Sequence, residues 1–182
     1  MRRVWIVVAS ILAFGAVNVR ESSAQATFAT FMLIPQIPGE STDRSHARWI
    51  DVISLRQTAD RETTSSPGAA QTNANVACEI EIIKFLDAAG PPIWAAAVTG
   101  QVFSEIQIEV VHQNSGDVRY KLKLVDARIS SISTATEGAF PLDRVVLTMA
   151  SATLTYTPID DRGPRAPITS MLDCAGGGRR AA

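Results

Sequence analysis

The sequence predicts a mainly β protein, an antiparallel β-barrel or β-sandwich with one short α-helix on its flank. Three observations support this fold class. Apolar and polar residues alternate over several short segments, a pattern typical of half-buried strands. Residues that favour turns separate these segments. The segment Asp87–Gly100 has the proline and glycine punctuation of a short helix.

Composition fits a single domain with its own core. The chain has 182 residues, of which 46% are hydrophobic and 19% are charged. With 17 Lys and Arg against 18 Asp and Glu, the formal net charge is -1. This balance gives no support for a partner such as nucleic acid, which would need a basic surface. A four-ligand zinc site of the usual Cys and His kind would need all 2 Cys and 2 His of the chain.

The first 26 residues have the order of a secretory signal peptide. Arg2 and Arg3 form a positive region, Val4–Val17 is uncharged and mostly apolar, and a polar region ends in Ala24-Gln25-Ala26. The apolar run is shorter than the roughly 20 residues of a spanning helix. We therefore expect cleavage after Ala26, with an uncleaved anchor or a buried helix as the alternatives. No later run is long enough to span a bilayer, so the predicted location is secreted or periplasmic.

Strands are predicted in the first half of the remaining chain. Phe28–Pro35 is apolar and bounded by prolines, and Val76–Ile82 alternates in the manner of a half-buried strand. Trp49–Gln57 is also a strand candidate, and its apolar residues fall on both faces. Between these strands, Thr58–Asn75 is polar and predicts a long loop.

The helix Asp87–Gly100 follows. Pro91 and Pro92 suit a first helical turn, where a missing N–H costs nothing, and Gly100 suits the end of the helix. Since its residues are mostly apolar, we expect it to lie against the sheet.

A hairpin is the clearest local prediction. Glu105–Val110 and Arg119–Leu124 alternate on either side of Asn114-Ser115-Gly116, with Gly116 expected in the left-handed conformation. This turn pairs Glu109 with Lys121 on the polar face and Ile108 with Leu122 on the apolar face.

The last strands are predicted with less regular patterns. Val125–Ser133 continues as a polar strand, and Val145–Pro158 changes its apolar parity at Ala150-Ser151, which indicates a bulge that bends a long strand. The chain from Asp160 is rich in Gly, Pro and Arg, with one short apolar stretch at Ile168–Leu172. The predicted organisation is a signal peptide (1–26), one domain (27–174) and a flexible tail (175–182).

No catalytic, cofactor-binding or metal-binding residue is predicted. His46 and His112 are the candidate bases, but neither accompanies a nucleophile motif, so a structural role is favoured for both. Glu40, Asp43 and His46 lack a recognised spacing of metal ligands. The basic stripe of Arg119, Lys121 and Lys123 faces acidic neighbours and fits a solvated ladder better than a nucleic-acid surface. We therefore expect a protein that is not an enzyme.

Cys78 and Cys174 form an even pair after the signal segment. In an oxidising compartment such a pair favours a disulfide, with two separate buried thiols as the alternative. A bond between them would close a long loop and stabilise the fold by about 4 kcal/mol.

Several segments together resemble the haemolysin-coregulated protein (Hcp) family, the tube proteins of type VI secretion. They are Phe31–Asp43, His46, Trp49–Val52, Ile83–Ala89, Val98–Gly100, Leu122–Ser133, Val145–Leu147 and Leu154–Pro158. The resemblance implies a compact β-barrel that forms homo-hexameric rings, which stack into a tube and carry small effectors. It also implies secretion spike, sheath or effector proteins as partners, and it transfers no catalytic residue.

Two departures from the family's pattern separate two functional hypotheses. Members of the family usually lack a cleavable signal, and the usual Gly-Trp-Asp-like sequence near the C-terminus is replaced here by Met171-Leu172-Asp173-Cys174. The first hypothesis is a structural ring or tube subunit. The alternative is an exported Hcp-like module that binds a partner in the envelope or outside the cell.

Overall fold

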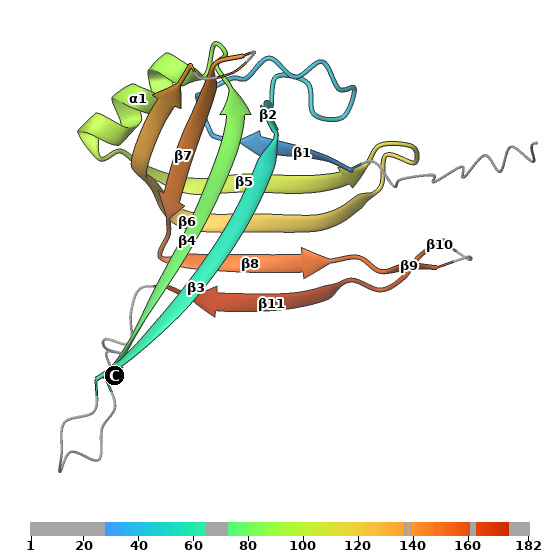
Figure 1. Cartoon of the computed structure of the whole chain (residues 1–182). Coiled ribbons are helices and arrows are strands. Elements are labelled where there is room, and N and C mark those ends of the chain that lie inside the picture. Colours follow the sequence, from blue (N-terminus) through green and yellow to red (C-terminus); the bar gives the residue numbers. More distant parts are fainter. Residues whose placement is uncertain (1–27, 65–72, 137, 139, 161–162, 175–182) are drawn as a thin grey trace, which may run out of the picture.

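The computed structural model describes residues 28–64, 73–136, 138, 140–160 and 163–174 (Figure 1). Its elements, in chain order, are β1 (Phe28–Leu33), β2 (Ile50–Val52), β3 (Ser54–Thr64), β4 (Asn73–Phe85), α1 (Gly90–Thr99), β5 (Val102–His112), β6 (Val118–Ala135), β7 (Leu142–Thr148), β8 (Ser151–Tyr156), β9 (Ile159–Asp160), β10 (Gly163–Pro164) and β11 (Ile168–Asp173). The predicted fold class is confirmed in this part of the chain, since antiparallel strands dominate and one short helix accompanies them. The sheet curves around a core but is not closed. The predicted signal peptide and tail lie outside the described residues.

The long strand β6 organises the sheet. On one side it pairs with β5, and on the other side it pairs first with β8, through Tyr120–Val125, and then with β7, through Arg128–Ala135. The predicted hairpin register is confirmed: Glu109 lies opposite Lys121 and Ile108 opposite Leu122. Gly116 in the turn has a φ of 74°, the left-handed conformation that glycine adopts at little cost.

The sheet divides where β7 gives way to β8. The two strands are separated by Met149 and Ala150, at the bend that the change of apolar parity predicts. The Ala150 N–H donates to the Val125 carbonyl at 3.1 Å, which keeps the bent segment on β6. β7 continues the sheet to β4 and β3, whereas β8 continues it to β11. The β3–β4 pair and the β8–β11 pair therefore diverge (Figure 1).

The prediction of a long loop at Thr58–Asn75 is wrong over most of its length. β3 runs on to Thr64 and β4 begins at Asn73, with Thr58 opposite Glu79 and Thr63 opposite Ala74. The two strands form an arm that extends beyond the end of β7 (Figure 1). Threonine suits strands, but this segment lacks the alternation of apolar and polar residues that indicates a half-buried strand. Residues 65–72 of the predicted loop lie outside the described residues.

Two further strand boundaries differ from expectation. Trp49–Gln57 is divided into β2 and β3 at Ile53, whose N–H donates to the Ile83 carbonyl at 2.7 Å. The apolar stretch Ile168–Leu172 forms strand β11, which pairs with β8 and places Leu172 opposite Ala152. All six residues of β11 are exposed, so the sequence has no alternation of apolar and polar residues there that would indicate a half-buried strand.

Helix α1 begins at Gly90, later than the predicted Asp87, because Asp87–Ala89 form the turn before it, whereas its C-terminal end agrees with the prediction. Pro91 and Pro92 occupy its first turn, and Gly100 has a φ of 65° at its C-terminus. Ile93 and Ala96 are buried, and the helix contacts β6. Trp94 and Val98 are exposed, so only one side of this apolar helix covers the sheet.

A buried lysine joins three elements at the start of the helix. The Lys84 side chain is fully buried, and its Nζ donates to the Phe85 carbonyl at 2.8 Å. It also contacts Asp143 on β7 at 3.1 Å and Asp87, before the helix, at 2.6 Å. Because burying an unpaired charge is very costly, these contacts fix the positions of β4, β7 and the helix start relative to one another.

The core lies inside the curved sheet, and Leu122 of β6 is part of it, with 1% of its surface exposed. We expect Leu122→Ala to lower the free energy of unfolding by about 2–5 kcal/mol, because it removes buried methyl groups and leaves a cavity. Met171→Ala is the control, since Met171 is 80% exposed, and it should change stability by less than about 0.5 kcal/mol. Urea denaturation measures both, and a loss below about 0.5 kcal/mol in Leu122→Ala would contradict the assignment of strand faces.

Candidate functional site

His46 lies buried between two aromatic rings. It belongs to the segment between β1 and β2, where the Gly39 N–H donates to the Arg48 carbonyl at 2.8 Å. The imidazole stacks on Phe31 with 4.3 Å between ring centroids, and the Trp49 ring meets it edge-on at 4.8 Å. Only 4% of His46 is exposed, so this side chain is part of the packed structure.

Both ring nitrogens of His46 face carboxylates. Nδ1 lies 2.8 Å from Asp43 Oδ1, and Nε2 lies 2.9 Å from Glu109 Oε2 on β5. A protonated ring donates to both oxygens. Asp43 Oδ1 also accepts the backbone N–H groups of Ser45 and His46, both at 2.9 Å. The cluster therefore pins the segment between β1 and β2 onto β5.

Glu109 connects this cluster to the hairpin. Its Oε1 contacts Lys121 Nζ at 2.8 Å, the cross-strand partner that the register predicts. Burial raises the pKa of Glu109, but the hydrogen bonds from Lys121 and His46 outweigh burial and leave that pKa below its usual value. The hydrogen bond from His46 likewise lowers the pKa of Asp43, more than burial raises it.

The expectation of an exposed Glu109–Lys121 pair is therefore wrong for its acidic partner. Glu109 is 8% exposed, because His46 covers the strand at this point. The neighbouring pair of Glu105 and Lys123, 2.6 Å apart, does fit the predicted solvated ladder, with side chains that are 32% and 47% exposed. Sequence alternation placed Glu109 on the correct face but could not show what covers that face.

The other residues considered for a metal or catalytic site do not converge. Glu40 Oε1 accepts the Ala88 N–H at 3.2 Å, before the helix, whereas Asp43 turns to His46. Within the described ranges, no group of three His, Cys, Asp or Glu side chains is placed to hold a metal ion. His112 lies at the end of β5, where its Nδ1 is 3.1 Å from Ser115 Oγ and its ring meets Phe28 edge-on.

Cys78 and Cys174 are joined by a disulfide in the structure. Cys78 lies on β4 and Cys174 directly follows β11, with 5.4 Å between their Cα atoms. The Cys174 N–H also donates to the Ala150 carbonyl at 2.8 Å. The bond thus links the β3–β4 arm to the β8–β11 pair across the gap where the sheet divides.

The surface offers apolar side chains and unpaired strand edges for association. Among the described residues, β3 pairs only with β4 and β11 only with β8. Exposed apolar side chains lie on the helix, on β11 and near the ends of β4 and β7. They include Ile53, Phe85, Leu86, Trp94, Val98, Phe140, Ile168 and Met171. Such side chains, together with open edges, are typical of surfaces that other chains cover.

The pattern of the protein family described as "Type VI secretion system effector, Hcp" matches residues 31–160 of the sequence. No curated protein matches the sequence. None of the described helices is long and apolar enough to cross a membrane.

Solved structures share the fold over most of the chain. One, described as a type six secretion system protein, is 26% identical with a TM-score of 0.70, covering 81% of this chain and 96% of that one. Hcp1 from Salmonella typhimurium is 21% identical, with a TM-score of 0.68 and coverage of 80% and 94%. A type VI secretion system effector from Yersinia pestis is 19% identical, with a TM-score of 0.61 and coverage of 79% and 98%.

The burial of Glu109 generates a prediction that depends on pH. At neutral pH we expect Glu109→Gln to cost about 1–3 kcal/mol, because His46 and Lys121 lose a charged acceptor in a buried place. Because the pKa of Glu109 is lowered on folding, its contribution is present above the usual glutamate pKa of about 4.3 and is lost as the pH falls below it. The difference in stability between the wild type and this variant should therefore shrink in acid.

The matched control is Glu105→Gln, on the same strand and the same face. Its partner Lys123 is exposed, so the expected cost is below about 1 kcal/mol. Urea denaturation of the three proteins from pH 7 to pH 3 gives these free energies. An equal cost for the two variants at pH 7 would contradict a special role for the His46 contact.

Proposed function

Because this chain belongs to the Hcp family of type VI secretion proteins, we propose that it is a structural subunit that forms hexameric rings. The rings would stack into a tube and carry effector proteins, with spike and sheath components as further partners. The observation that carries the proposal is the match of the family's pattern over 31–160, reinforced by solved Hcp structures with the same fold.

The surface of a single chain supports association. A head-to-tail contact between identical chains buries two different patches, and it closes into a ring when the rotation permits. This chain has different patches to offer, with Met171 on β11 and Val98 on α1 both more than three-quarters exposed. The β3–β4 arm projects from the rest of the sheet, and we assign to it the contact with the next ring (Figure 1).

The chemistry of the site supports a structural role rather than an enzymatic one. His46 has both ring nitrogens engaged with carboxylates, stacks on Phe31 and makes a T-shaped contact with Trp49. A general base needs a nitrogen that a substrate or a nucleophile can reach. We therefore assign to this segment the role of holding β1, β2 and β5 together.

A second proposal, an exported Hcp-like binding module, is favoured by the disulfide between Cys78 and Cys174. Disulfides persist in oxidising compartments such as the periplasm or the outside of the cell. Residues 1–26 have the order of a secretory signal, so the chain would reach such a compartment by the general export route.

Mass measurement in solution tests assembly. For the purified protein we expect a hexamer by sedimentation velocity, and we expect Met171→Asp to shift the mass toward the monomer, because a charge would be buried in the contact. Gln113→Asp, in the exposed turn between β5 and β6, is the matched control and should remain assembled.

Deletion of Thr63–Thr72 should leave rings but reduce stacking. A compact monomer at high concentration would overturn the ring and leave the binding module in its place.

Export is tested separately from assembly. When the full sequence is expressed in a bacterium with general secretion, the exported chain should begin at Thr27, as read by N-terminal sequencing. An exported chain that still begins at Met1 would contradict the cleaved signal, whatever its oligomeric state.

A further inference from the structure

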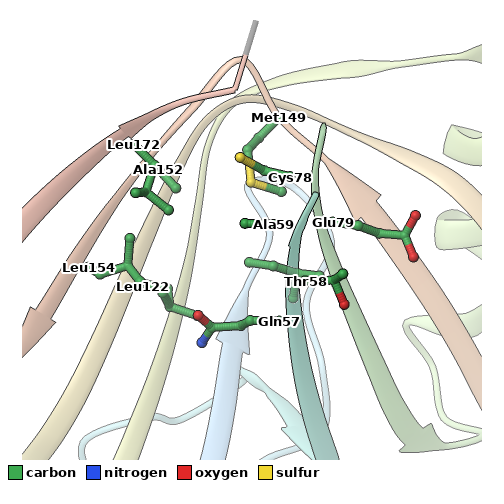
Figure 2. Close-up of a pocket in the computed structure, with 11 residues that line it drawn as sticks. Gln57, Thr58, Ala59, Cys78, Glu79, Leu122, Met149, Ala152, Leu154 and Leu172 are labelled. Carbon is green, nitrogen blue, oxygen red and sulfur yellow. The ribbon is translucent and has the colours of Figure 1, made fainter. Parts of the chain in front are cut away.

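A small cavity, partly open to solvent, lies in the gap where the sheet divides (Figure 2). Its volume is about 180 Å³. One wall is formed by the β3–β4 arm and the other by β6, β8 and β11, while Met149 stands at one end beside Cys78 (Figure 2). The apolar residues of the lining are Ala59, Ile80, Leu122, Met149, Ala152, Leu154 and Leu172.

Two contacts between the walls limit the cavity. At one end the disulfide joins Cys78 to Cys174, and at the other the Tyr120 hydroxyl donates to Gln57 Oε1 at 3.0 Å. β3 makes no strand pairing with β8 or β11 among the described residues, so these contacts hold the walls together without backbone hydrogen bonds. The space is thus framed by fixed elements rather than by a loop.

The lining of the cavity is mainly apolar, and two of its residues are small. Ala59 on β3 and Ala152 on β8 leave space that a larger side chain would fill. The carboxylate of Glu79 points away from the cavity, and the Gln57 amide lies at its lower edge (Figure 2). A charged molecule would lose its hydration here without gaining a partner, whereas an apolar one would gain contacts.

From this geometry we propose that the cavity binds a small uncharged apolar molecule, about the size of one aromatic ring. An enclosed apolar cavity of about 150 Å³ in another protein takes up benzene, so a partly open cavity of similar volume has room for a ligand of that class. The Gln57 amide at the edge suits a ligand with a single polar atom. This site lies beyond the proposed assembly function and does not depend on it.

Toluene is the probe, and benzoate, a charged molecule of similar shape, is the control ligand. In methyl NMR spectra of the purified protein, toluene should shift the signals of Ile80, Leu122, Leu154 and Leu172 in a saturable way. Benzoate at the same concentrations should leave them unchanged, because its carboxylate would be desolvated. Binding to the folded state should also raise the midpoint of thermal unfolding.

A matched pair of variants locates the site. Ala59 lies opposite Cys78 and faces the cavity, whereas Ala77 lies opposite Asp60 on the other face of the same arm. Both alanines are exposed, so replacement by leucine should leave the fold intact, as circular dichroism can confirm. Ala59→Leu fills the cavity and should weaken toluene binding about tenfold or more, whereas Ala77→Leu should bind as the wild type does.

Saturable shifts confined to the lining methyl groups, and lost in Ala59→Leu alone, would support the site. The proposal is overturned if those shifts do not saturate, if benzoate reproduces them, or if Ala59→Leu binds toluene as tightly as Ala77→Leu. Each outcome is independent of the mass of the assembly, so failure here leaves the ring proposal standing.

Discussion

The pairing of β6 on both of its sides is the constraint on which the rest of the structure depends. β5 is held on one side in the register that opposes Glu109 and Lys121, while β8 and then β7 are held on the other. Because side chains alternate along a strand, a slip of one residue would turn Leu122 and Leu124 away from the core. The helix, the β3–β4 arm and β11 are then placed by the strands that β6 has fixed.

The bend at Met149–Ala150 has a structural consequence. It sends β7 toward β4 and β3, and β8 toward β11, so the sheet divides into two branches. Across that division the structure uses side chains in place of a backbone ladder, through the disulfide of Cys78 and Cys174 and the hydrogen bond of Tyr120 to Gln57. The apolar cavity occupies the same gap, since two walls that do not pair cannot approach as closely as neighbouring strands.

Hydrogen bonds and ion pairs of buried charged groups hold neighbouring elements of this fold together. Lys84 joins β4, β7 and the start of the helix, and His46 joins the segment before β2 to Glu109 on β5. Each of these groups is fully engaged, since no buried side-chain nitrogen or oxygen among the described residues is without a partner. These buried contacts favour one arrangement of the elements, in keeping with the structural role of the family.

The sequence by itself determined the antiparallel class, the hairpin register, the C-terminal end of the helix and the bend near Ala150, because local alternation and turn residues encode them. The family was visible in the motif around His46 and Trp49. Only the tertiary structure decided that Thr58–Thr64 is a strand, that Ile168–Asp173 pairs with β8, and that Glu109 is buried while Glu105 is not. The physical reason is that strand alternation records which face a residue occupies, whereas the covering of that face depends on segments far away in the chain.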